Sequence, residues 1–151
     1  MDLQALSDQL ELQRLITVYA HALDERNFTR LDEVFTPDAQ IDYTAMGGIA
    51  GDWPRIRRWL PEAMKPFPAY MHLMGNCLFD VTGDVASGKI ACFNPMVVSP
   101  PEGAEQVMFL GLWYADRYAR TPAGWRISER VERRGYMHGM PEWMRKALQV
   151  S

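Results

Sequence analysis

Residues Glu105–Arg120 read EQVMFLGLWYADRYAR, a run with apolar side chains on both alternations of an extended chain. Val107, Phe109 and Trp113 fall on one alternation, and the other carries Met108, Leu110, Leu112 and Tyr114. Because successive side chains of a β-strand point to opposite faces, this pattern predicts a strand of a curved sheet with apolar cover on both sides. We expect helices to cover one face and a second copy of the chain to cover the other.

Three more segments have strand character and are separated by turn residues. They are Met71–Val81, Val85–Val98 and Trp125–Tyr136, and the turns are Thr82-Gly83-Asp84, Pro100–Gly103 and Thr121–Gly124. Short turns join neighbouring antiparallel strands. The second half of the chain is therefore predicted to be an antiparallel meander of four long strands.

The first half has mainly helical periodicity. Apolar residues at three- and four-residue steps predict helices over Ser7–Glu25, Phe28–Phe35, Asp52–Met64 and Trp143–Leu148, and an alternating pattern predicts one strand over Gln40–Thr44. The second helix should stop before Thr36-Pro37-Asp38, because a proline disfavours helix at the residue before it. Helices followed by long antiparallel strands indicate an α+β fold, in a single domain of residues 1–151.

Composition and charge argue against several classes of protein. The 151 residues suffice for one domain with a sizeable core. A net charge of −3 with scattered Lys and Arg offers no basic stripe for phosphates, so we expect no nucleic-acid partner. The apolar runs are too short to cross a bilayer and the first residues lack a signal-peptide layout, so a cytoplasmic protein without membrane contact is expected. Cys77 and Cys92 are expected to be reduced and buried.

A series of short matches extends along nearly the whole chain. It comprises YAHALDERNF at Tyr19–Phe28, FTPDA at Phe35–Ala39, IDY at Ile41–Tyr43, MHLMGN at Met71–Asn76, VTGDVA at Val81–Ala86, and Tyr118 spaced from GWRI at Gly124–Ile127. These residues resemble the scytalone dehydratase and SnoaL-like branch of the nuclear-transport-factor-2-like superfamily. The resemblance implies a cystatin-like roll, in which N-terminal helices cap a cone-shaped, curved, mixed or antiparallel sheet. Such folds host dehydratases, isomerases, polyketide cyclases, hydroxylase subunits and non-enzymatic binders.

The same resemblance implies catalytic roles for Asp24, His72 and Tyr43. Asp24 and His72 match the pocket aspartate and histidine of scytalone dehydratase and the bile-acid dehydratases, and Tyr43 matches a pocket tyrosine of scytalone dehydratase. The candidate substrate-binding residues are Tyr19, Trp59, Asn94, Tyr114 and Arg134. Among them, Tyr19 resembles a tyrosine of the bile-acid dehydratases. Arg134 falls near the position of an arginine in those enzymes, which implies that it anchors an anionic substrate tail.

The chain departs from scytalone dehydratase in two places. Phe93 or Asn94 stands where that enzyme has a second pocket histidine, and Leu112 and Tyr114 stand where it has a serine and an asparagine. These differences imply a more apolar cavity and a substrate other than scytalone.

The residues themselves support acid–base chemistry. Asp24 lies beside the apolar stripe near the end of the first predicted helix, where burying a carboxylate is costly without a partner. A neutral imidazole at His72 can donate one ring N–H to it, which leaves the other nitrogen to exchange a proton with substrate. Tyr43 or Tyr19 would then donate to a developing oxyanion. This chemistry requires no metal or redox cofactor, and the sequence has no metal-ligand spacing.

Each candidate also has a purely structural interpretation that the sequence leaves open. Asp24 suits a helix end facing water, His72 a satisfied position at the core rim, and Tyr43 a core position with its hydroxyl at the edge. Other polar residues are expected outside the site: His21 in solvent, His138 in a flexible C-terminal segment, and Arg130, Arg133 and Arg134 on a solvated face paired with Glu129 and Glu132.

We therefore expect a cofactor-independent dehydratase or isomerase that acts through Asp24 and His72 on a small, cyclic, largely apolar, hydroxylated substrate. The alternative is a non-catalytic module of the same fold that binds a small ligand or supports an oxygenase as a subunit. The first interpretation predicts that Asp24 and His72 lie within hydrogen-bond reach or share a water, and the second predicts a filled cavity or a histidine pointing away from it. Both are compatible with a homo-oligomer, a dimer or a trimer.

Overall fold

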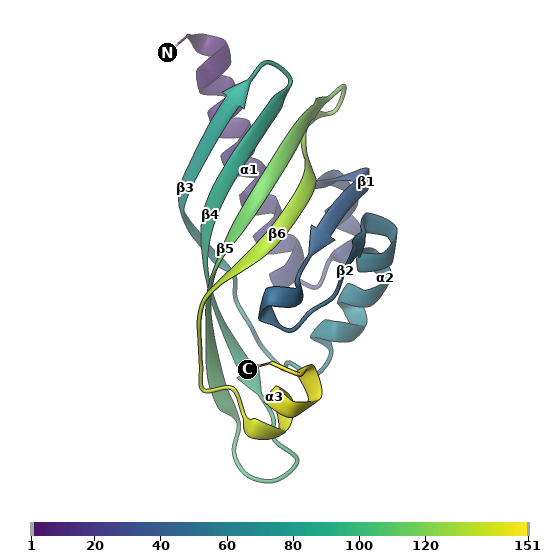
Figure 1. Cartoon of the computed structure of the whole chain (residues 1–151), viewed down its shortest axis with the longest axis vertical. Coiled ribbons are helices and arrows are strands. Elements are labelled where there is room, and N and C mark those ends of the chain that lie inside the picture. Colours follow the sequence, from purple (N-terminus) through teal and green to yellow (C-terminus); the bar gives the residue numbers. More distant parts are fainter. Residues whose placement is uncertain (1, 151) are drawn as a thin grey trace.

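A curved sheet wraps around the N-terminal helices in the computed structural model, which describes residues 2–150 (Figure 1). The helices are α1 (Leu3–Asp24), α2 (Trp53–Met64) and α3 (Glu142–Leu148), with 3₁₀ turns at Phe28–Glu33 and Thr44–Met46. The strands are β1 (Phe35–Asp42), β2 (Ala50–Asp52), β3 (Leu73–Thr82), β4 (Val85–Val98), β5 (Gln106–Thr121) and β6 (Gly124–His138).

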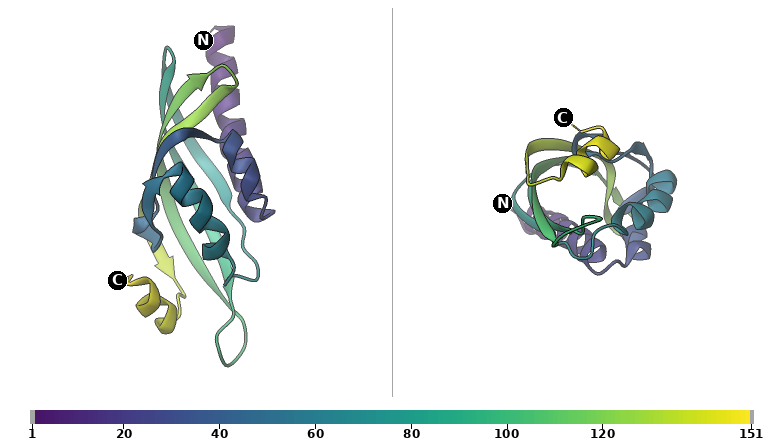
Figure 2. Two further views of the ribbon diagram at one scale, coloured as in Figure 1. Left: turned by 90° about the vertical axis from the view of Figure 1, so that its right-hand side faces the viewer. Right: turned by 90° about the horizontal axis from the view of Figure 1, so that it is seen from below.

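The six strands form one mixed sheet in the order β2-β1-β6-β5-β4-β3. β1 runs parallel to β6, and the other neighbouring pairs are antiparallel. Seen from below, the sheet and helices close around a central interior (Figure 2). The α+β cone predicted from the sequence is confirmed, and the four-stranded meander forms its larger part.

The inner face of the sheet packs on α1, whose apolar stripe is buried as the periodicity predicts. From α1 the core receives Leu12, Leu15, Ile16, Tyr19 and Leu23, and from β5 and β6 it receives Met108, Leu112, Tyr114, Tyr118, Trp125 and Ile127. Asp2 caps α1 by accepting a hydrogen bond from the N–H of Ala5 at 2.7 Å. These contacts fix the direction of α1 and therefore the position of its last residue, Asp24.

A buried aspartate attaches the first turns of α1 to the end of β5 and the start of β6. Asp8 accepts two hydrogen bonds from the guanidinium of Arg120, at 2.8 and 2.9 Å, and one from Nε1 of Trp125 at 3.0 Å. These donors favour the charged carboxylate. The Arg120 guanidinium in particular holds the pKa of Asp8 well below its usual range.

Two irregularities bend the ladder between β5 and β6. Its register shifts between Gly111 and Leu112 and again between Arg117 and Tyr118, so β6 has Gly135 and Ser128 as extra residues. An extra residue increases the local twist and changes which face the following side chains take. The shift at Ser128 has a direct effect on the site described below.

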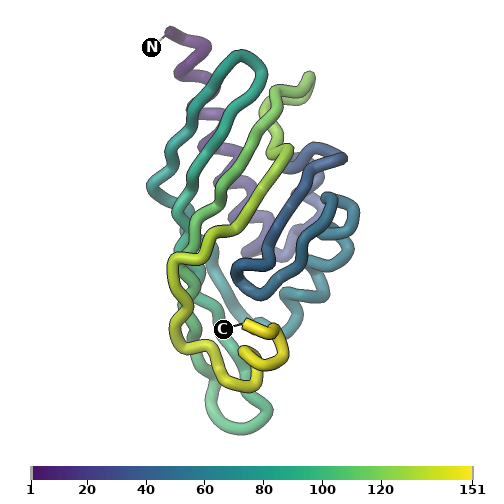
Figure 3. Tube along the Cα trace, in the orientation of Figure 1, coloured from purple at the N-terminus to yellow at the C-terminus, as the bar shows by residue number. Residues whose placement is uncertain are grey.

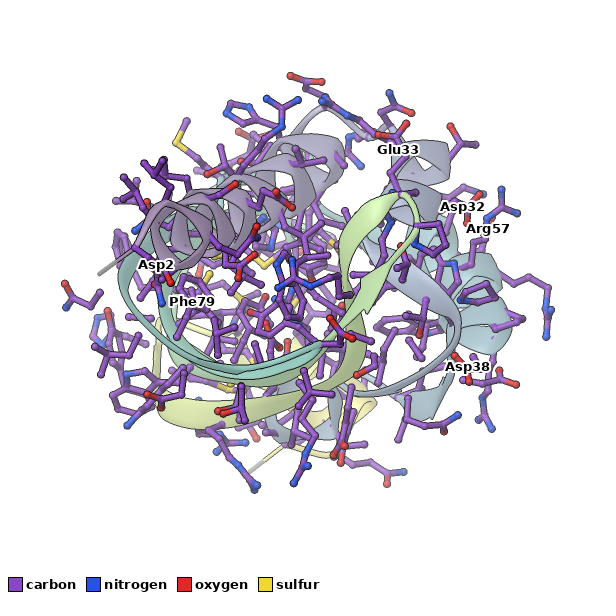
Figure 4. All side chains as sticks on the ribbon, turned by 90° about the horizontal axis from the view of Figure 1, so that it is seen from above. Asp2, Asp32, Glu33, Asp38, Arg57 and Phe79 are labelled. Carbon is purple, nitrogen blue, oxygen red and sulfur yellow. The ribbon has the colours of Figure 1, made fainter. Side chains whose placement is uncertain are left out.

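Contacts at the rim hold α2 against the sheet. Figure 4 looks down from the end at which α1 begins, and it shows Asp32 and Arg57 side by side at the edge. Arg57 lies 2.9 Å from one carboxylate oxygen of Asp32, and Nε1 of Trp53 donates to the other at 3.0 Å. The Trp53 ring stacks on Phe35 at 4.7 Å. The start of α2 is thus fixed against β1.

The boundaries of β1 and β2 differ from the prediction. β1 begins at Phe35 rather than Gln40, and it accommodates Pro37 because the ladder with β6 is interrupted between those two residues. β2 is a three-residue edge strand that pairs with β1 and carries no alternating signal. No helix within residues 2–150 is long and apolar enough to cross a membrane.

Candidate active site

A cavity of about 480 Å³ lies between the inner face of the sheet, α2 and the C-terminal segment. Six of the predicted site residues line it, namely Tyr19, Tyr43, Trp59, His72, Asn94 and Tyr114. Much of the remaining wall is apolar and includes Leu23, Met96, Met108, Leu110 and Leu112. Ala147 and Leu148 close one side, where the C-terminal segment lies beside the loop after β1 (Figure 3). The volume is that of an ordinary small-molecule site.

His72 and Asp24 form a hydrogen-bonded pair at the wall of this cavity. Asp24 ends α1, and His72 directly precedes β3. Nδ1 of His72 lies 2.7 Å from Oδ1 of Asp24, and the backbone N–H of His72 donates to both carboxylate oxygens at 3.1 and 3.0 Å. The two side chains are 7% and 21% exposed, respectively. Since a carboxylate only accepts, Nδ1 of the neutral ring carries the hydrogen, and Nε2 is the nitrogen able to accept a proton.

Neighbouring polar contacts hold the two halves of the pair together. The hydroxyl of Tyr70 donates to the carbonyl of Leu23 at 2.9 Å, and its ring packs edge-on against His72 at 5.8 Å. Nδ2 of Asn94 donates to the carbonyl of Met71 at 2.9 Å. Asn94, which the sequence suggests as a substrate-binding residue, therefore also fixes the backbone that carries His72.

The hydroxyls of Tyr19 and Tyr43 lie 2.8 Å apart in the cavity wall. Burial raises the pKa of Tyr19 and raises that of Tyr43 well above its ordinary value, so both are neutral hydrogen-bond donors. Two hydroxyls that bond to each other use one of their two hydrogens, which leaves the second for another acceptor. Trp59 extends this wall, with its ring 6.2 Å from that of Tyr43.

Residues 4–131 match the family model described as the SnoaL-like domain. The chain belongs to this family. It is 52% identical over 127 residues to the uncharacterized protein Rv2910c of Mycobacterium tuberculosis (strain ATCC 25618 / H37Rv), an alignment that covers 84% of this chain and 85% of the relative. The SnoaL-like assignment thus agrees with the resemblance found in the sequence.

Solved structures share the fold of this SnoaL-like domain at low identity. A candidate scytalone dehydratase from Novosphingobium aromaticivorans DSM 12444 superposes with a TM-score of 0.79 and 16% identity, covering 91% of this chain and 90% of that chain. The hexachlorocyclohexane dehydrochlorinase LinA-type3 from Novosphingobium barchaimii LL02 superposes with a TM-score of 0.78 and 19% identity, covering 93% and 99%. These likenesses establish the fold.

A buried ion pair lies behind the cavity wall, where the sequence interpretation is wrong. The sequence pattern predicts Arg130 in solvent, but the side chains of both Arg130 and Asp116 are 0% exposed. Nε and Nη2 of Arg130 lie 2.8 and 2.6 Å from the two carboxylate oxygens of Asp116. The guanidinium carbon lies 4.2 Å from the ring centre of Tyr19 and 4.0 Å from that of Tyr114. The pair therefore supports two rings of the cavity wall.

The extra residue at Ser128 is the physical reason for this correction. Strict alternation from Trp125 and Ile127 would place Arg130 and Glu132 on the outer face, but the register shift brings both to the inner face. One feature of the sequence does indicate the buried pair. Asp116 falls on the same alternation as Tyr114 and Tyr118, and a lone carboxylate in a buried apolar row requires a charged partner.

Other predicted residues lie away from the cavity. Nε and Nη2 of Arg134 donate to the carbonyl of Ala45 at 3.1 Å each, outside the cavity lining, and its role with an anionic substrate stays a prediction. His138 is the last residue of β6 and pairs with Phe109 of β5, so its prediction in a flexible segment is wrong. The side chain of His21 is exposed, as expected. Both cysteines are free; Cys92 is buried as expected, whereas Cys77 is partly exposed, contrary to expectation. Residues 2–150 contain no cluster of side chains suited to hold a metal ion.

Proposed function

We propose that this SnoaL-like protein is a cofactor-independent lyase of the dehydratase or isomerase type. Its substrate is a small, cyclic, largely apolar molecule with a carbonyl and a hydroxyl group. The observation that carries the proposal is the 2.7 Å contact between His72 and Asp24 at the wall of an apolar cavity. A partly buried acid–base pair whose histidine lines a ligand-sized space is a typical arrangement for proton transfer.

The proposed reaction begins with proton removal by Nε2 of His72 from a carbon next to the substrate carbonyl. The electrons of that C–H bond form an enolate, whose oxygen accepts a hydrogen bond from Tyr43 or Tyr19. The enolate then re-forms the carbonyl and expels the hydroxyl from the β-carbon. His72 returns its proton to the departing oxygen, so the products are an unsaturated ketone and water. In an isomerase, the proton returns to a different carbon instead.

Asp24 has a positioning role in this scheme. Its carboxylate holds Nδ1–H of His72, which fixes the tautomer and stabilises the imidazolium that forms after proton removal. Two solved structures with the same fold give independent support, because one is named as a candidate dehydratase and the other as a dehydrochlorinase. Both names denote elimination of a small molecule from a substrate.

The test is turnover of a panel of hydroxylated cyclic ketones, followed by the absorbance of the conjugated product. We expect His72→Ala and Asp24→Asn to lower kcat/KM by about 10² to 10⁴-fold, the usual contribution of general acid–base catalysis. His21→Ala is the matched control, because that histidine is exposed near the end of the helix that carries Asp24. Activity that survives intact in both site variants would eliminate the mechanism.

A non-catalytic binding module, alone or as a subunit of an oxygenase, is the second candidate. The mutual hydrogen bond of Tyr19 and Tyr43 favours it, because this bond satisfies part of the polar wall without any substrate. This candidate predicts that a ligand of the panel binds without being converted. Measuring binding and product formation on the same samples separates the two functions.

We also propose that the chain forms a homo-oligomer through the outer face of the sheet. Leu73, Phe93, Gly111 and Tyr136 form one row across β3, β4, β5 and β6 by strand register. The three side chains of this row and the neighbouring Trp113 are exposed large hydrophobics. A contiguous apolar face on a folded chain is typical of a protein interface, and a second copy would cover it in a dimer or a trimer.

A further inference from the structure

Glu132 is a carboxylate that the proposed mechanism does not use, although it lines the same cavity as His72. It lies on β6 directly opposite Tyr114 of β5, on the inner face that the extra residue Ser128 creates. Its Oε2 atom is buried and has no hydrogen-bond partner among the described residues. Within residues 2–150 no cation lies within ion-pair distance of Glu132, and Arg130 on the same strand pairs with Asp116 instead.

An ionised carboxylate in this environment is unfavourable. Transfer of a charged carboxyl group from water into a buried site is costly when one of its oxygens has no hydrogen-bond donor, and a proton removes that cost. Burial accordingly raises the pKa of Glu132 well above its ordinary value, against opposing contributions from Arg130 and from the backbone N–H of Met46. The charge of Asp42 on β1 acts in the same direction as burial.

The remaining titratable groups near Glu132 do not supply a counter-charge. They are Tyr19 on α1, Tyr43 after β1, Cys92 on β4 and Tyr114 on β5. Burial raises the pKa of each of these groups, so all are neutral near pH 7. The charged groups that act most on Glu132 are therefore one paired arginine and one carboxylate.

We propose that Glu132 is a protonated hydrogen-bond donor in the cavity wall and that it selects a neutral ligand carrying a carbonyl oxygen. The inference rests on the proposed function and deepens it, because it names a further group, beside the tyrosines, that recognises the carbonyl of the substrate. The last torsion of a glutamate side chain has a broad, roughly two-fold distribution, so the hydroxyl can turn from its buried position toward a ligand. The acidic proton is then shared with the ligand oxygen and stays on the carboxyl group.

A neutral carboxyl group differs from a tyrosine in one respect that serves recognition. Tyr19 and Tyr43 use one hydroxyl hydrogen in the bond between them, whereas the buried oxygen of Glu132 has no hydrogen-bond partner within residues 2–150. A ligand oxygen supplies the acceptor that this group lacks. A hydrocarbon of the same shape leaves the group unsatisfied, so the site favours the ketone over the hydrocarbon.

Binding of unreactive probes tests this inference separately from catalysis. We would measure the affinity of 1-tetralone and of tetralin, its hydrocarbon analogue, by calorimetry with wild type, Glu132→Gln and Glu132→Leu. Wild type is expected to prefer the ketone by about tenfold, the usual net value of a hydrogen bond made in a buried site. Glu132→Gln retains a donor and keeps the preference, and Glu132→Leu loses it while still binding tetralin.

The pH dependence adds a second arm. Because the folded-state pKa of Glu132 is raised, wild type keeps the ketone preference at neutral pH and loses it as the pH rises through that value. The preference of Glu132→Gln does not change over the same range, although both proteins contain the same other titratable groups of the cavity wall. Equal affinities for the two probes in wild type, no binding of the ketone, or a preference that survives in Glu132→Leu would overturn the inference.

Infrared spectroscopy provides a readout that needs no ligand. The spectrum of wild type minus that of Glu132→Gln at neutral pH should contain the carbonyl stretch of one protonated carboxyl group. A difference spectrum with only carboxylate bands would contradict the inference even if the protein proved to be a lyase. Conversely, the carboxyl band and the ketone preference would stand if no turnover were found.

Discussion

Replacement of Arg130 by methionine is expected to lower the free energy of unfolding by about 3–5 kcal/mol. Methionine fills much of the same space but removes both hydrogen bonds to Asp116, at 2.8 and 2.6 Å. The carboxylate that remains is 0% exposed and retains the hydrogen bond from the hydroxyl of Tyr118, at 2.7 Å. A domain of this size has a total stability of about 5–15 kcal/mol. The substitution therefore removes a large fraction of it.

Urea unfolding followed by circular dichroism measures this loss. The matched control is Arg117→Met, because the guanidinium of Arg117 lies 3.5 Å from Glu129 in an ion pair on the surface of the same two strands. An exposed pair contributes about 0–1 kcal/mol. In the double variant Arg130→Met/Asp116→Leu no buried charge is left, so part of the stability should return. An Arg130→Met variant as stable as Arg117→Met would refute the argument that this buried pair supports the cavity wall.

Three further predictions concern other parts of the molecule. The pKa of Asp8 is lowered in the folded state, chiefly by Arg120, so this carboxylate adds stability above its unfolded pKa of about 4, and that stability is lost as the pH falls through the folded value. Between neutral pH and about pH 2, the urea midpoint of Asp8→Asn should therefore fall less than that of wild type. Equal falls would contradict this linkage. Burial raises the pKa of Cys92 to about 12. In a thiol-labelling time course at mildly alkaline pH, the partly exposed Cys77 should therefore react before Cys92, and equal labelling rates would contradict this prediction. Trp113→Arg places a charge on the outer face of the sheet and should reduce the mass measured by light scattering to that of a monomer; an unchanged oligomer would place the interface elsewhere, and a monomeric wild type would remove the proposal.

The architecture could be predicted from the sequence because its largest helices and strands show clear apolar periodicity. The apolar stripe of α1 and the double-sided alternation of Glu105–Arg120 predict a helix and a central strand, and both are present. The strand β2 escaped prediction because three residues are too few to show a period. Its pairing depends on the neighbouring strand β1 rather than on its own residues.

The residues behind the cavity wall were harder to predict from the sequence, for a different reason. A single extra residue, Ser128, reverses the faces of Arg130 and Glu132, and such a bulge has no signature in the alternation of a polar segment. The resemblance to known families directed attention to Asp24 and His72, which lie 48 positions apart in the chain. Local patterns alone do not bring such distant residues together.

Proton exchange at the carbon next to a ketone tests the central claim most directly, because it requires only the proposed base and no leaving group. Cyclic ketones would be incubated in deuterated buffer with wild type, His72→Asn and the exposed-site control His21→Asn, and the loss of the α-proton signal would be followed by NMR. We predict exchange above the buffer rate with wild type and the control, and exchange reduced to the buffer rate with His72→Asn. Equal exchange by wild type and His72→Asn, or none above the buffer rate in any sample, would contradict the role given to His72.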